Sequence, residues 1–498
     1  MYSMKNPQRR RIIISAGAAV ASLTVPLALA SSATAATVAQ FNKGHHVLTI
    51  FGDAGGNAIT VGRDAAGDIV VNGGSVRIHG ARATVRNVDR IVVFGRYGND
   101  RIALDETNGP LPSAVLRGGA GDDLLVGGSG ADALSGGGGN DTLLGGGGDD
   151  LLDGEIGNDS LTGGRGSDQS LGRAGDDQLI WNPGDGSAVN EGGDGSDTVV
   201  VNGGAVGEAF NTTANGTRVR FDRVSPLPFS LDIGSSERLV LNANGGDDSF
   251  ASSGDLASLI ALAVDGGPGN DRLSGGNGND ELSGGAGDDV VDGNAGADSA
   301  GLGDGNDSFV WDAGDGSDTV EGQAGQDSLV FNGAAAAEKL DLSAHGSRAL
   351  LVRDVGRITM DLNGLERIET NALGGTDTVT VSDLSGTDVG VADVHLAGAP
   401  GVLSGDGAAD SVVVNATDRS ERATITGDEK GGVTISGLHT VVNVTGTDGP
   451  SDALTFNAFD GDDTVDATGL APGVVGLTVN GGAGTDLLLG GPGTVLIQ

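Results

Sequence analysis

The chain has 498 residues, of which 93 are glycine and only 3% are aromatic, and its formal net charge at pH 7 is −40. This charge excludes nucleic acid as a partner, because so acidic a surface repels a polyanion. Cysteine is absent from the sequence, so disulfides and thiolate metal sites are excluded as well. The excess of carboxylates instead favours a hard cation with oxygen ligands, such as calcium.

The first 36 residues are predicted to be a signal peptide. Lys5 and three arginines precede an apolar run over residues 12–30, and Ala-x-Ala cleavage motifs place the start of the mature chain near Ala36. A membrane anchor is the alternative, but Pro26 and the small residues make a poor span, and no later segment is apolar over a spanning length. We therefore expect a secreted, extracellular protein without a membrane span, exported by either the general or the twin-arginine route.

Residues 37–117 are expected to form a β-rich module. Segments such as 84–95 are apolar over strand lengths and are bounded by Gly, Asn or Asp. No convincing helix of about ten residues follows the signal peptide. The sequence therefore favours an all-β protein with frequent turns.

The next part of the chain repeats with a period of nine. From Gly118 to Ile180 there are seven consecutive nonapeptides, beginning GGAGDDLLV, GGSGADALS and GGGGNDTLL, with Gly always fourth and Asp always sixth. A second array of five units covers residues 266–310, and one further good unit, GGAGTDLLL, covers residues 481–489. Such a constant aspartate register indicates a structural repeat.

Each unit combines a glycine turn with a carboxylate. Glycine permits positive φ and brings backbone carbonyls close together, and the apolar eighth residue, such as Leu125 or Leu143, is expected to point inward from a short strand. Calcium takes six to eight oxygens, more than one turn supplies. We therefore expect ions to lie between stacked turns.

The pattern G-G-x-G-x-D-x-U-x, with U apolar, resembles the RTX or haemolysin-type calcium-binding repeat. The resemblance implies an elongated parallel β-roll or β-solenoid, in which two nonapeptides make one coil and Ca²⁺ is held in the turns along both edges. It implies glycine carbonyls as co-ligands and the following carboxylates as metal ligands: Asp123, Asp132, Asp141, Asp150, Asp159, Asp168, Asp177, Asp197, Asp271, Asp280, Asp289, Asp298, Asp307, Asp318, Asp327 and Asp486.

A longer repeat contains the arrays. Residues 180–203 align without a gap onto residues 310–333. In addition, an acidic residue is followed eleven positions later by Asp in four places, at Asp100, Asp248, Asp377 and Asp463, and in three of them a nonapeptide Asp comes after exactly 23 more residues. In the frame of Asp377, that position is Pro400, so this copy is predicted to have lost its calcium-type array. Asp410 lacks a matching glycine, and weak or no calcium binding is expected over 401–480.

These patterns divide the chain into interspersed β-strand modules and calcium-binding arrays. The predicted segments are the signal peptide (1–36), a β-rich N-terminal module (37–117), the first array (118–203), a β-rich module (204–265), the second array (266–333), degenerate β-rich modules (334–480) and a terminal RTX-like turn (481–498).

The sequence favours a secreted calcium-binding protein over an enzyme. HExxH, G-x-S-x-G and P-loop motifs are all absent. Two alternatives stay open: a calcium-dependent adhesin or surface-layer component, whose partner would be a cell-surface or matrix polymer, and a β-helix enzyme that degrades polysaccharide. Trp181 and Trp311, which follow the arrays, are read either as hydrophobic caps of the core or as aromatics that stack on carbohydrate.

Overall fold

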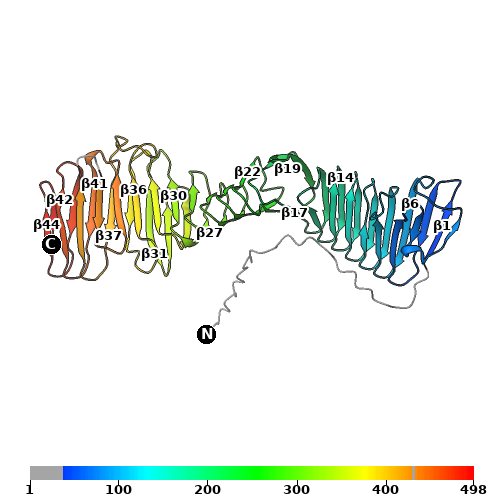
Figure 1. Ribbon diagram of the computed structural model, residues 1–498. Coiled ribbons are helices and arrows are strands. Elements are labelled where there is room, and N and C mark those ends of the chain that lie inside the picture. Colours follow the sequence, from blue (N-terminus) through cyan, green and yellow to red (C-terminus); the bar gives the residue numbers. More distant parts are fainter. Residues whose placement is uncertain (1–36, 429–431) are drawn as a thin grey trace, which may run out of the picture.

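The computed structural model describes residues 37–428 and 432–498, and the predicted signal peptide lies outside them. Within these ranges the chain is a long solenoid of stacked coils, with β1 at one end and β44 at the other (Figure 1). The described part contains no α-helix, only two single-turn 3₁₀ helices, η1 (Asn72–Gly74) and η2 (Val355–Arg357). None of its helices is long and apolar enough to span a membrane. The predicted all-β, elongated parallel β-roll with interspersed modules is confirmed.

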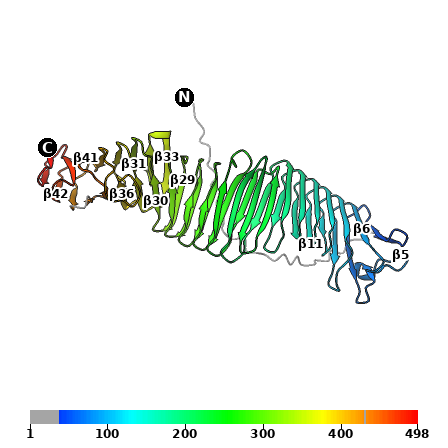
Figure 2. The same cartoon turned by 90° about the horizontal axis from the view of Figure 1, so that it is seen from above.

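Two sheets form the walls of the solenoid, and strands that follow one another along the chain mostly alternate between them (Figure 2). Sheet A runs, in spatial order, through β5 (Ile78–Gly80), β1 (Val38–Asn42), β2 (Val47–Phe51), β6 (Arg90–Tyr97), β8 (Ala114–Ala120), β10 (Ala133–Gly138), β12 (Leu151–Ile156), β14 (Asp168–Ala174), β16 (Ala188–Asp194), β20 (Phe229–Gly234), β19 (Arg218–Ser225), β18 (Ala209–Asn215), β22 (Ser249–Ser253), β24 (Arg272–Ser274), β26 (Val290–Asp292), β28 (Ser308–Trp311), β30 (Ser328–Asn332), β34 (Arg367–Asn371), β36 (Val391–His395), β40 (Val441–Thr445), β39 (Val433–Ser436), β38 (Arg422–Gly427), β42 (Thr464–Leu470) and β44 (Leu487–Gly490).

Sheet B runs through β4 (Ile69–Val71), β3 (Ala58–Arg63), β7 (Arg101–Asp105), β9 (Leu124–Val126), β11 (Thr142–Gly147), β13 (Ser160–Arg165), β15 (Gln178–Trp181), β17 (Thr198–Asn202), β21 (Arg238–Asn242), β23 (Ala261–Pro268), β25 (Glu281–Ala286), β27 (Ser299–Gly305), β29 (Thr319–Gly325), β33 (Ile358–Asn363), β32 (Arg348–Arg353), β31 (Lys339–His345), β35 (Thr378–Val381), β37 (Ser411–Asn415), β41 (Gly449–Asn457), β43 (Val475–Asn480) and β45 (Val495–Ile497).

Within the arrays the strands are parallel, and one coil takes eighteen residues. Leu125 pairs with Leu143 in sheet B, and Leu134 pairs with Leu152 in sheet A. These leucines are 0–1% exposed, so the eighth position of the nonapeptide fills the interior as predicted. The period of nine therefore places successive units on opposite walls, and the period of eighteen stacks them.

Three antiparallel insertions interrupt the parallel order. Strands β18, β19 and β20 form a three-stranded meander within sheet A, and so do β38, β39 and β40 further along. Strands β31, β32 and β33 form the equivalent meander within sheet B. The meanders lie within the predicted β-rich segments 204–265 and 334–480, and the parallel stack resumes on both sides of each one.

Tight stacking favours glycine at particular positions of the turns. Gly137 has a φ of +118°, and a Cβ placed on it would lie 2.0 Å from the carbonyl oxygen of Gly119 in the preceding coil. Gly138, its neighbour, has open space at the corresponding point. At Gly137, position two of its unit, glycine suits both the positive φ and the close approach, although Glu155 and Arg173 adopt a positive φ at position two of later coils.

We expect Gly137→Ala to destabilise the first array by about 1–3 kcal/mol or more, because the strained backbone and the clash with a carbonyl add together. Thermal unfolding in saturating calcium, followed by circular dichroism, measures the effect. Gly138→Ala is the matched control, and it should leave the melting temperature nearly unchanged. Equal melting temperatures for the two variants would contradict the proposed packing.

Candidate calcium-binding turns

The aspartates at position six form continuous hydrogen-bonded ladders along the edges of the solenoid. The backbone N–H of Asp123 donates to Oδ1 of Asp141 in the next coil at 2.7 Å, and the N–H of Asp141 donates in turn to Oδ1 of Asp159. Each carboxylate thus fixes the turn of the coil before it. Because the acceptor is charged, these are strong hydrogen bonds.

Ladders lie along the sheet A edge and along the sheet B edge, with N–H to Oδ1 distances of 2.7–3.1 Å. The sheet B edge carries Asp100, Asp123, Asp141, Asp159, Asp177 and Asp197, then Asp280, Asp298 and Asp318, and then Asp377, Asp410 and Asp452. The sheet A edge carries Asp132, Asp150 and Asp168, then Asp248, Asp271, Asp289, Asp307 and Asp327, and then Asp463 and Asp486.

Glutamates terminate two of the ladders. Oε2 of Glu237 accepts the N–H of Asp197, and Oε2 of Glu366 accepts the N–H of Asp327. Both glutamates belong to the frames in which an acid precedes an Asp by eleven positions. In these two copies the fold explains the acid of the frame, because the longer glutamate side chain closes a ladder that no further aspartate continues.

The second carboxylate oxygen of most ladder residues is buried without a partner. Oδ2 is enclosed and accepts no hydrogen bond in twelve of the sixteen predicted ligands: Asp123, Asp141, Asp150, Asp159, Asp177, Asp197, Asp271, Asp289, Asp298, Asp307, Asp318 and Asp327. A buried carboxylate oxygen without a partner is costly. The ladder therefore provides a hydrogen-bond donor for Oδ1, whereas Oδ2 remains available to bind a cation.

Ten of these twelve oxygens point toward a glycine five residues earlier, at the start of the same unit, and the exceptions are Asp307 and Asp318, whose units begin with Leu302 and Ala313. A Cβ built on Gly136, the first residue of the unit, would lie 2.3 Å from Oδ2 of Asp141, and one on Gly118 would lie 2.1 Å from Oδ2 of Asp123. At these glycines the turn brings a carboxylate oxygen and backbone carbonyls close to the Cα, where a side chain would collide with them. Oxygen ligands of this kind suit calcium.

Burial raises the pKa of the ladder carboxyls. The pKa of Asp141 is raised to about 7 and that of Asp298 to about 8, mainly by desolvation, with like charges on neighbouring coils adding to it and the backbone hydrogen bonds opposing it. The same causes raise the pKa of Asp150 and Asp289 to about 7. A divalent cation beside these groups would reverse the effect, because an opposite charge favours the ionised form.

The donor set fits calcium only if backbone oxygens take part. The described residues contain no group of three or more His, Cys, Asp or Glu side chains arranged to hold a metal ion. With one buried carboxylate per turn, the remaining ligands would be carbonyls of the glycine turns and the carboxylate of an adjacent coil. The location of the ions between stacked turns stays a prediction.

Two predicted ligands lie in turns of a different kind. Oδ1 of Asp132 accepts the N–H of Ala114, and its Oδ2 accepts the N–H of Gly128 at 2.7 Å. Asp280 likewise accepts from Leu262 and Gly276. Both oxygens of these carboxylates are engaged by the backbone, so the two turns are closed without an ion. Asp168 and Asp486 stand on the ladders, but their Oδ2 atoms are not among the enclosed, partnerless ones.

The sequence prediction omitted three carboxylates that have the same geometry. Asp100, Asp248 and Asp463 are buried ladder residues with enclosed, unpartnered Oδ2 atoms. They lie outside any good nonapeptide, but each precedes an array aspartate by exactly 23 residues. That spacing was the available signal, since it places these residues one coil before the first unit.

The third frame requires a correction. Pro400 does not occupy the ladder position that follows Asp377. The N–H of Asp377 donates to Oδ1 of Asp410, 33 residues further on instead of 23. The connection is ten residues longer, and the ladder continues across it to Asp452. The edge of the solenoid is therefore preserved here, although the nonapeptide pattern is absent.

Both tryptophans lie inside the solenoid. Trp181 is 2% exposed and stacks on Phe229, and Trp311 is fully buried and stacks on Phe331. The indole N–H groups donate to the carbonyls of Gly186 and Gly316. Burial excludes the carbohydrate-stacking alternative, and the two side chains pack where the arrays meet the meanders.

A comparison with protein families agrees with this geometry. The family described as "RTX calcium-binding nonapeptide repeat (4 copies)" matches residues 114–143, 144–179, 265–300, 302–329 and 478–496. The chain therefore carries RTX calcium-binding nonapeptide repeats, and the matched segments contain fifteen of the sixteen predicted ligands, all except Asp197. No curated protein matches the chain significantly.

Among solved structures, the chain is similar to the extracellular lipase LipA from Serratia marcescens. The identity is 15%, the match covers 56% of this chain and 43% of that chain, and the TM-score is 0.15. The chain thus matches less than half the length of that lipase.

Proposed function

We propose that this chain is a secreted, non-catalytic calcium-binding protein in which ion binding folds the two nonapeptide arrays. The observation that carries the proposal is the row of buried carboxylate oxygens without partners, most of which face a glycine of the same turn. The nonapeptide repeats support calcium as the ion, and the predicted signal peptide supports export. Ordering of glycine-rich segments is opposed by a large loss of backbone entropy, and calcium would offset this loss.

Isothermal titration of the mature chain with calcium tests the binding. We expect on the order of ten ions per chain, because each ion takes six to eight oxygens and adjacent turns have to share it. Magnesium should bind far less well, since it demands a small octahedral site. Absence of a binding signal at millimolar calcium would overturn the proposal.

A matched pair of variants tests the role of the free oxygen. In Asp141→Asn the oxygen that faces the turn is lost to an amide, so we expect the calcium concentration at half-folding to rise by about tenfold, equivalent to about 1.4 kcal/mol. In Asp132→Asn an amide group replaces an oxygen that accepts a backbone N–H. We expect this variant to lose stability to a similar extent with and without calcium.

The two variants are compared by calcium titrations followed by circular dichroism. Each variant controls for the other, because both substitutions remove one charge from a ladder aspartate of the first array. If the midpoint for Asp132→Asn rose as far as that for Asp141→Asn, the unpartnered oxygen would have no special role.

A further inference from the structure

The three meanders share a position at which a glutamate follows a short connection from the preceding strand. Glu208, Glu338 and Glu421 each come immediately before the first meander strand, and the N–H of each donates to the carboxylate of a ladder aspartate. The three sites are therefore copies of one arrangement, and their differences can be compared residue by residue.

In the first two copies the glutamate is neutralised by a buried arginine. Arg223 forms an ion pair with Glu208 at 2.7 Å, and Arg353 forms one with Glu338, with all four side chains at most 9% exposed. Each guanidinium also lies over an indole ring, Arg223 over Trp181 at 5.0 Å and Arg353 over Trp311 at 5.3 Å. A buried charge needs such a partner.

The third copy retains the glutamate and lacks the groups around it. Strand pairing places Val381 opposite Val414, where Trp311 stands opposite Phe331 in the second copy. In the second copy, Arg353 pairs with Leu340, which lies two residues after the glutamate. The residue two positions after Glu421 is Ala423. Because Thr424 pairs with Ser436 in an antiparallel register, Ala423 lies opposite Gly437, which therefore takes the place of the arginine. The tryptophan, the phenylalanine and the arginine are thus replaced by two valines and a glycine.

A cavity of about 190 Å³ occupies the space of these missing side chains. Val381, Val414 and Gly437 line it together with Glu421. Oε1 of Glu421 accepts the hydroxyl of Thr417, and Oε2 is buried without a hydrogen-bond partner, as Oε2 of Glu338 also is in the second copy. Burial, together with the neighbouring carboxylate of Asp463, raises the pKa of Glu421. Among the described residues, no Arg or Lys forms an ion pair with this carboxylate.

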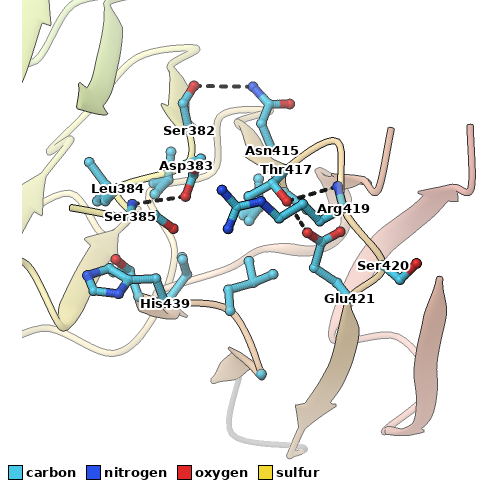
Figure 3. A pocket seen from close by; sticks show the side chains of 17 residues that line it. Ser382, Asp383, Leu384, Ser385, Asn415, Thr417, Arg419, Ser420, Glu421 and His439 are labelled. Atoms are coloured by element: carbon cyan, nitrogen blue, oxygen red, sulfur yellow. Dashed lines mark hydrogen bonds between the residues drawn. The ribbon is translucent and has the colours of Figure 1, made fainter. Parts of the chain in front are cut away.

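Other polar side chains stand around the opening. Figure 3 shows Asp383 and His439 across the cavity from Glu421, with Arg419 between them. Arg419 is exposed, and the carboxylate of Asp383 accepts the N–H of Ser385. The cavity is therefore open to solvent-borne groups, and carboxylates lie on two of its sides.

We propose that this cavity binds a guanidinium group on an aliphatic stem, either free arginine or an arginine side chain of a peptide. The ligand replaces the internal arginine of the other two copies: its guanidinium meets Glu421, and its stem lies against Val381 and Val414. The proposal does not depend on calcium binding by the arrays, because the cavity is formed by side chains outside them.

Calorimetric titration of the full mature chain, in saturating calcium, with L-arginine tests the proposal. We expect an affinity of about 1 mM or better. L-Citrulline, which has the same shape without the charge, should bind at least tenfold more weakly. A titration with N-acetyl-arginine amide distinguishes the sources, because tighter binding of this probe points to a peptide side chain and tighter binding of L-arginine points to the free amino acid.

Three variants complete the experiment. Glu421→Gln should weaken L-arginine binding at least tenfold, and the double variant Val381→Trp/Val414→Phe, which restores the aromatic pair of the second copy, should abolish it. Arg419→Gln should bind L-arginine as well as the parent chain or better. Melting temperatures in calcium show whether each variant is folded. L-Arginine should raise the melting temperature of the parent chain and leave the melting temperature of the Val381→Trp/Val414→Phe variant unchanged.

Several results would overturn the proposal. One is that L-citrulline binds as tightly as L-arginine, and another is that the Glu421→Gln variant binds L-arginine as tightly as the parent chain. Loss of L-arginine binding in the Arg419→Gln variant would mean that the cavity recognises an anion. Absence of both a calorimetric and a thermal effect of arginine on the folded parent chain would also overturn it.

Discussion

In a chelator at pH 7.5, the two nonapeptide arrays should unfold while the meander that contains β31, β32 and β33 stays folded. The arrays bring one carboxylate per turn into a buried row, and without a cation neighbouring charges repel along it. The meander instead contains the buried ion pair of Arg353 with Glu338 and an apolar interior. The two kinds of segment therefore depend on calcium to different extents.

Hydrogen exchange followed by mass spectrometry resolves the segments. Peptides from 118–203 and 266–333 should exchange at least about a hundredfold faster in chelator than in calcium, equivalent to about 2.8 kcal/mol. Peptides from 338–363 should change much less and serve as the internal control. Unchanged protection of the arrays after calcium removal would contradict the coupling of binding to folding.

Acid should partly replace calcium. The pKa of ladder carboxyls such as Asp141, Asp150 and Asp298 is raised in the folded chain to about 7 or 8, from about 3.9 for an unperturbed Asp. A raised folded pKa means that the folded state binds protons more tightly than the unfolded state. The contribution of these groups to stability is therefore fully present below about pH 4 and is lost as the pH rises through 6–8.

We accordingly expect the metal-free arrays to gain β-structure when the pH is lowered from 7.5 to about 5, where most ladder carboxyls of the folded form carry a proton. Circular dichroism in chelator across this range measures the change, and the calcium-saturated chain at pH 7.5, which we expect to be folded, provides the reference spectrum. Metal-free chain that lost β-structure on acidification over the same range would contradict the assignment of the buried carboxyls as the destabilising groups.

The period of nine in the sequence predicted the turns and the inward leucines, and its resemblance to the RTX repeat implied the parallel roll with two units per coil. Nine residues carry the turn, and eighteen bring one leucine above another, as Leu125 and Leu143 show. The fixed distance between Gly136 and Asp141 also predicted a carboxylate in a glycine turn. Such local patterns determine local geometry, so they can be read without a structure.

Other features of the site could not be predicted, because they depend on the contacts that a residue makes with the next coil. Asp132 and Asp141 occupy the same place in the repeat, but only the structure shows that the backbone engages both oxygens of Asp132. The role of Asp410 was hidden because the connection before it is ten residues longer than in the other copies. Longer loops are tolerated at little cost, so the ladder persists after the spacing that reveals it has gone.

The relation between Trp181 and Trp311 has a consequence for the whole solenoid. These residues are 130 positions apart and equivalent, but Trp181 lies in sheet B and Trp311 in sheet A. Between them the chain completes a whole number of coils and one further half, so each copy of the module is turned by half a revolution about the long axis. The meanders accordingly lie in sheets A, B and A in succession, so the solenoid presents its modules alternately on two opposite sides.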